Sequence, residues 1–110
     1  MPGSFDEREK GYEAKWVHDQ ELRFRVFSRR NRMLGLWAAG EMGLEGTDAE
    51  AYAKDIVAME FEKDGENAIF ARIRRNFDSR QITLTDHMIR RKMDELLESA
   101  KLEIEHESKN

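Results

Sequence analysis

The sequence contains no cysteine, a single proline (Pro2) and no long apolar run. The absence of cysteine excludes disulfide bonds, cysteine-based zinc sites, iron–sulfur clusters and thiol catalysis by this chain, and it fits a reducing compartment. Because no proline follows Pro2, nothing in the body of the chain forces a helix to break. No stretch reaches the roughly 18 apolar residues that a transmembrane helix requires, so we expect no membrane insertion.

The first residues also lack the pattern of an export signal. Asp6 and Glu7 stand where a secretory signal peptide would carry a cationic and then an apolar region. We therefore expect a cytoplasmic protein.

Charged side chains are as frequent as apolar ones. They make up 38% of the chain, against 39% hydrophobic residues, whereas an average soluble domain has about 25% and about 45–50%. The 19 basic and 23 acidic residues nearly cancel, which leaves a net charge of −4. Mixed charge of this kind is typical of a helical surface with many salt bridges. A chain of 110 residues predicts one small domain, and its acidic balance does not favour a dedicated nucleic-acid-binding protein.

Apolar residues recur with a helical period in four segments that are separated by turns. We expect helices over about residues 19–42, 47–61 and 66–78, and from about residue 85 onward. Gly43 is a natural C-cap for the first helix, residues 47–50 form a capping box for the second, and Thr85 can cap the fourth. The sequence thus predicts an all-α fold, a small four-helix bundle over residues 19–110, with residues 80–84 as a packed loop.

Residues 1–18 do not fit easily into that bundle. Phe5, Tyr12 and Trp16 fall close to one helical face, but Gly11 lies between them and costs about 1 kcal/mol relative to alanine. A helix this short is marginal in water without packing. We expect a partly disordered or marginally helical N-terminal arm that becomes helical against a partner. The alternative is a frayed first turn folded back onto the bundle.

No catalytic constellation emerges from the polar residues. None of the histidines, His18, His87 and His106, lies four residues from another, so no helical histidine pair can hold zinc. The chain has neither a P-loop nor a dinucleotide-binding glycine motif. We therefore expect a protein that is not an enzyme and has no metal or cofactor of its own.

The uneven feature is a basic run in the first helix. Five arginines and no acid stand between Leu22 and Leu34, and Arg25, Arg29 and Arg32 share one helical face. They could pair with the acid-rich residues 41–66, or bind RNA or DNA, nucleotide phosphates or an acidic protein surface.

Arg30 differs from its neighbours because it projects into the apolar face of the helix. A buried guanidinium needs a carboxylate or carbonyl partner, unless the side chain reaches past the edge of the bundle.

The motif RRNRMLGLWAA at residues 29–39 resembles the signature of the zeta-type ATPase inhibitor family of alphaproteobacterial F-type ATP synthases. The likeness continues through AEAYAKDIV at residues 49–57 and DHMIRRKMDELL at residues 86–97. It extends from Phe5 to about Ala100. The resemblance implies a four-helix bundle, in agreement with the periodicity.

The resemblance also implies a function. Members of the family are non-catalytic inhibitors of ATP hydrolysis by the F-type ATP synthase. Their N-terminal segment enters as a helix between the alpha and beta subunits of the catalytic head, near the gamma subunit, and the bundle anchors it outside. The corresponding residues here are Phe5, Asp6, Arg8, Glu9, Lys10, Tyr12, Glu13 and Trp16.

The resemblance further implies weak binding of ATP or ADP by the bundle, for which Arg25, Arg29 and Arg32 are the candidates. We expect a monomer when the protein is free. Two other functions stay open: a nucleotide-sensing regulatory bundle, and an RNA- or DNA-binding module that uses the arginine-rich first helix.

Overall fold

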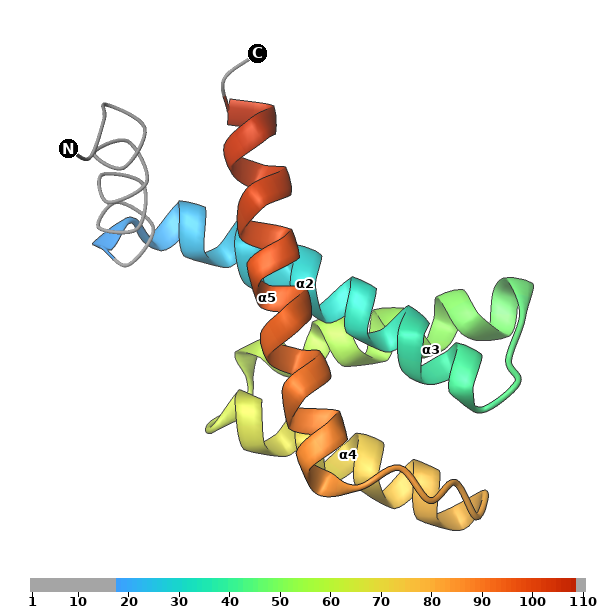
Figure 1. The fold of residues 1–110 in the computed structure, drawn as a ribbon. Helices are drawn as coiled ribbons and strands as arrows, with labels where there is room; N and C mark the ends of the chain where they lie inside the picture. Colours follow the sequence, from blue (N-terminus) through green and yellow to red (C-terminus); the bar gives the residue numbers. More distant parts are fainter. Residues whose placement is uncertain (1–17, 109–110) are drawn as a thin grey trace, which may run out of the picture.

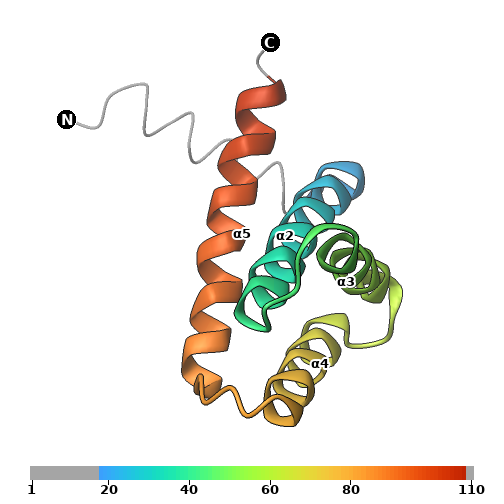
Figure 2. The ribbon, with the colours of Figure 1, turned by 90° about the vertical axis from the view of Figure 1, so that its right-hand side faces the viewer.

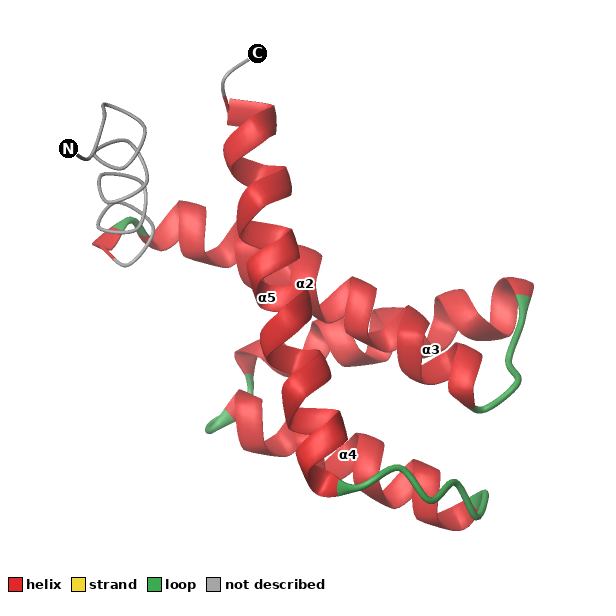
Figure 3. Ribbon diagram, in the orientation of Figure 1, coloured by secondary structure: helices red, strands yellow, loops and turns green. Residues whose placement is uncertain are grey.

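The computed structural model describes residues 18–108; residues 1–17, 109 and 110 lie outside this description. The described part forms four α-helices and one short 3-10 helix, and it contains no strand (Figures 1 and 3). The elements are α2 (Gln20–Glu41), α3 (Gly46–Ala58), η1 (Met59–Phe61), α4 (Gly65–Ser79) and α5 (Asp86–Ser108). The predicted all-α fold is confirmed. The predicted arm, apart from His18, lies outside the described residues.

Local capping interactions set the ends of the two long helices. The Asp19 side chain accepts a hydrogen bond of 3.0 Å from the backbone N–H of Leu22 and so caps α2. After α2, Gly43 takes a φ of 78°, a left-handed value that glycine adopts without steric cost. The Thr85 hydroxyl accepts a bond of 3.2 Å from the N–H of Met88 at the start of α5. The roles of Gly43 and Thr85 agree with the prediction, whereas Asp19 was not predicted as a cap.

The start of α3 differs from the prediction. The helix begins at Gly46 with Glu45 as its N-cap, and no side chain caps it, so the predicted capping box at residues 47–50 is wrong. Gly46 has a φ of 54°, which allows the chain to enter the helix before Thr47. Glu50 bonds Arg32 of α2 at 2.7 Å instead of its own helix end, because a charged partner gives a stronger hydrogen bond than a backbone N–H.

The end of α3 also differs. The α-helix stops at Ala58 and is followed by η1, so it does not extend to residue 61 as predicted. The Phe61 residue is 74% exposed.

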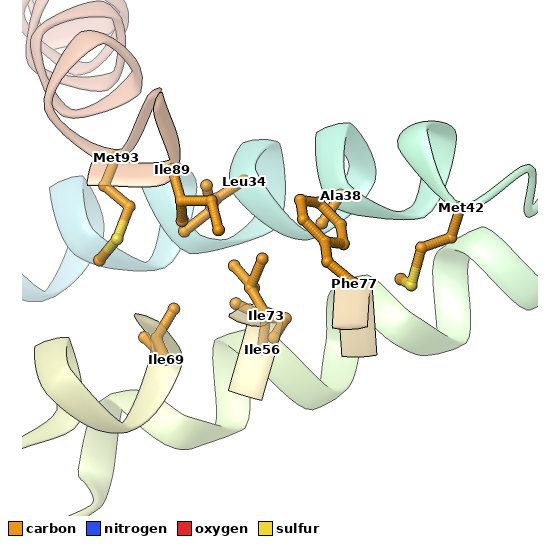
Figure 4. Close-up of a cluster of buried hydrophobic side chains, with 9 residues drawn as sticks. All are labelled: Leu34, Ala38, Met42, Ile56, Ile69, Ile73, Phe77, Ile89 and Met93. Carbon is orange, nitrogen blue, oxygen red and sulfur yellow. The ribbon is translucent and has the colours of Figure 1, made fainter. Parts of the chain in front are cut away.

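The main hydrophobic core draws side chains from all four helices, as Figure 4 shows. It comprises Leu34, Ala38 and Met42 from α2, Ile56 from α3, Ile69, Ile73 and Phe77 from α4, and Ile89 and Met93 from α5. Burying a leucine, isoleucine, phenylalanine or methionine side chain contributes about 1.5–3 kcal/mol to the stability of the fold. Ile82 and Leu84 pack against this core, which confirms the packed loop between α4 and α5.

Helix α2 is the central element of the bundle. α3 lies along it, and α5 crosses it so that the C-terminal half of α5 projects beyond the other helices (Figures 1 and 2). A second, smaller apolar cluster joins the first half of α2 to this part of α5; its buried members are Leu22, Val26, Ala100 and Ile104. α2 and α3 approach closely at Gly35, where an added Cβ would lie 2.7 Å from the Ala53 Cα.

Candidate functional site

The arginines that share a face of α2 pair with carboxylates of two different helices, and Arg25 and Arg29 share Glu107. Arg29 forms an ion pair of 2.8 Å with Glu107 of α5, Arg32 forms one of 2.7 Å with Glu50 of α3, and Arg25 lies 3.9 Å from Glu107. The hydrogen bond from Arg29 lowers the pKa of Glu107, and the hydrogen bond from Arg32 lowers the pKa of Glu50. Arg29 and Arg32 therefore point to different helices, and the structure does not bring them into one pocket. Their assignment to nucleotide phosphates stays a prediction.

The pairing that the sequence suggested for the basic run is correct in part. Arg32 and Arg30 pair with Glu50 and Glu66, both within the acid-rich residues 41–66. Arg29 instead pairs with two carboxylates of α5, of which Glu103 lies 2.7 Å away. The positive charge of α2 is thus largely balanced within the molecule.

Arg30 is fully buried, and it has the partners that its position demands. Its Nε donates to the Asn31 Oδ1 at 2.8 Å, one Nη donates to the backbone carbonyl of Met93 at 3.2 Å, and the other Nη forms an ion pair with Glu66. The Phe27 ring centroid lies 5.3 Å from the guanidinium carbon. The expected carboxylate and carbonyl partners are confirmed, and the network joins α2, α4 and α5.

A groove of about 320 Å³ lies above this network, between the first half of α2, η1 and the start of α4. Asn31, Glu66 and the buried Ile69 line its inner part. Phe24 also lines the groove, and its exposed ring contacts that of Phe61, which lies outside the lining; the ring centroids are 5.7 Å apart and the planes are tilted by 37°. The groove therefore has a mixed lining, in which Phe24, Phe27 and Ile69 lie beside polar and charged side chains.

Two charged residues of the groove differ in how they are partnered. Arg23 forms no ion pair within residues 18–108. Glu60 accepts a hydrogen bond of 2.9 Å from the Ser28 hydroxyl. Burial raises the pKa of Glu60, while the Ser28 bond and the Arg30 charge oppose that rise. The groove thus offers a cation that no carboxylate of residues 18–108 pairs with, and a partly desolvated carboxylate.

Two classes of site find no support in the described helices. Within residues 18–108, no helix combines the length and apolar character needed to cross a membrane. The same residues contain no group of three or more side chains that could hold a metal ion.

The amino-acid sequence matches a known protein family over most of its length. The family model described as ATPase inhibitor subunit zeta covers residues 2–103. The chain belongs to the ATPase inhibitor subunit zeta family. The family indicated by the sequence motifs is therefore confirmed, and the match includes both the arm and the bundle of this zeta-family chain. A comparison with curated protein sequences gave no match.

The arm residues between Phe5 and Trp16 that the resemblance singled out lie outside the described residues, so their roles stay predictions. The groove, in contrast, was missed by sequence reasoning. Phe24 lies within the basic run of the first helix and Phe61 at the end of the helix predicted over about residues 47–61, but neither position predicted a groove. The sequence EFEKD at residues 60–64 places a phenylalanine among charged residues, and this pattern could have indicated an exposed aromatic ring.

Proposed function

We propose that this chain is a non-catalytic inhibitor of ATP hydrolysis by the F-type ATP synthase, acting at the cytoplasmic head of the enzyme. The observation that carries the proposal is the family match over residues 2–103, which spans the arm as well as the bundle. Membership in an inhibitor family supports the inhibitory role. The packed core of four helices supports the bundle as a preformed anchor.

In the proposed mechanism, the arm inserts as a helix between an alpha and a beta subunit, close to the gamma subunit. A rotary enzyme must open and close this interface in each cycle, so a helix lodged there stops hydrolysis without any chemistry of its own. Folding on binding costs ordering free energy, and the affinity per contact is therefore modest. Docking of the bundle compensates by raising the effective concentration of the arm.

The junction between arm and bundle supports this division of roles. Asp19 has φ −95° and ψ 107°, an extended conformation, so α2 does not run continuously into the preceding residue. Because Asp19 caps α2 with its own side chain, the bundle does not depend on the arm for its first turn.

The test is an ATPase assay on isolated synthase head from which the natural inhibitor has been removed. The full-length protein should slow hydrolysis, and a variant that lacks residues 1–18 should not. This variant retains the Asp19 cap, so its circular dichroism and unfolding curve should show an intact bundle. Equal hydrolysis rates with and without the full-length protein would contradict the proposed function. Equal inhibition by the two proteins would contradict the role of the arm.

A further inference from the structure

Two aromatic side chains at the groove are exposed in a protein that is otherwise highly charged. Phe24 is 47% exposed and Phe61 74% exposed, and their rings contact each other at the groove rather than within the core. Exposed apolar groups at a concave site indicate that something docks there. A volume of about 320 Å³ is at the lower end of the range of about 300–1,000 Å³ for ligand sites. A groove of this volume can hold one or two aromatic side chains but not a folded domain.

The chain itself brings aromatic side chains to this place. Gln20, the first residue of α2, lines the groove, and the arm precedes it directly. Trp16 is four residues before Gln20, so an extended chain places it within about 14 Å of that residue. Such a short tether gives the arm an effective concentration in the millimolar range at the groove.

The chemistry of the segment at residues 12–16 complements the groove. Its sequence YEAKW places one acid and one base between two aromatic residues. Glu13 can meet Arg23, which has no carboxylate partner within the described residues, and Lys15 can meet Glu60. A buried indole also needs an acceptor for its N–H, and the carboxylates of Glu60 and Glu66 both line the groove.

We propose that the groove is a seat for the arm of the same chain, with the Trp16 indole held between Phe24, Phe27 and Phe61. The consequence for activity rests on the proposed function: an arm in the groove is withheld from the synthase, and the two destinations compete. The apparent affinity for the synthase then falls in proportion to the fraction of molecules whose arm is free.

Nuclear magnetic resonance of the full-length protein tests the seat directly. The indole N–H signal of Trp16 is identified by its loss in Trp16→Phe. Nuclear Overhauser effects should connect the Trp16 indole to the rings of Phe24 and Phe27. Phe61→Ser, at a side chain that supports no core packing, should weaken these effects and move the indole signal toward that of an exposed tryptophan. Leu102→Ser is the matched control, because Leu102 is 63% exposed on α5, whereas the groove is lined by residues of α2, η1 and α4.

The absence of these Overhauser effects in the unmodified protein would overturn the seat. Signals that change on dilution would also overturn it, because they would assign the groove to a second copy of the chain. In the ATPase assay, Phe61→Ser should inhibit at an about tenfold lower concentration if nine arms in ten are seated, and Leu102→Ser should match the parent. Unchanged potency of Phe61→Ser despite the Overhauser effects would overturn the competition. Failure of the proposed function is recognised separately, as absence of inhibition by the parent protein.

Discussion

Arg30 should be among the residues that contribute most to the stability of the bundle. In Arg30→Ala, a side chain with none of its surface exposed is removed, and truncation of a large buried residue costs about 2–5 kcal/mol. The Asn31 Oδ1 also loses the donor that lies 2.8 Å away, and a buried acceptor without a donor costs about 1–3 kcal/mol. The Glu66 side chain is 50% exposed, so water can replace the arginine there. The two contributions add to an expected loss of about 3–8 kcal/mol.

Urea unfolding followed by far-ultraviolet circular dichroism measures this loss as a change in the free energy of unfolding. Arg30→Met keeps most of the packing and removes only the polar contacts, so it should lose about 1–3 kcal/mol and serves where the alanine variant fails to fold. Arg91→Ala is the control, because the Arg91 side chain is 71% exposed and forms a surface ion pair with Glu95; it should lose at most about 0.5 kcal/mol. If Arg30→Met and Arg30→Ala both matched this control, Arg30 would not be a buried structural cation.

Two other substitutions check the helix contact and the groove. Gly35→Ala should lower the free energy of unfolding by about 1–3 kcal/mol, because its Cβ would lie 2.7 Å from the Ala53 Cα. At Gly40 an added Cβ would meet no atom within 4 Å outside its own stretch of helix, so Gly40→Ala should raise the free energy of unfolding by up to about 1 kcal/mol. If both substitutions changed the free energy of unfolding with the same sign, the packing of α2 on α3 would be contradicted. Since burial raises the pKa of Glu60 above 4.5, the parent should lose stability as the pH rises from 4.5 through that raised pKa, and this loss should be smaller in Glu60→Gln. Urea unfolding at several pH values between about 4 and about 7 measures the stability of both proteins. Identical pH profiles for the parent and Glu60→Gln would refute the contribution of Glu60.

Local patterns predicted the helices well where capping involves neighbouring residues. Thr85 accepts a bond from a backbone N–H three residues further along, as the local pattern predicted. Asp19 makes the same kind of bond at the start of α2, although it was not predicted as a cap. The capping box at residues 47–50 failed because Glu50 has a charged partner in another helix. A local pattern does not contain that competitor, since it depends on how α2 and α3 pack.

The same distinction applies to the groove and the charged side chains. The position of Arg30 on the apolar face of α2 required a buried partner, but the choice of Glu66 depended on where α4 begins in space. The contact of Phe24 with Phe61 likewise forms because α3 ends at Ala58 and η1 brings Phe61 next to α2. The sequence alone therefore determined the all-α class, the approximate ends of most helices and, through its motifs, the inhibitor family. Tertiary structure alone decided which charges pair and where a groove opens, because these contacts join residues far apart in the chain and follow from the packing of whole helices.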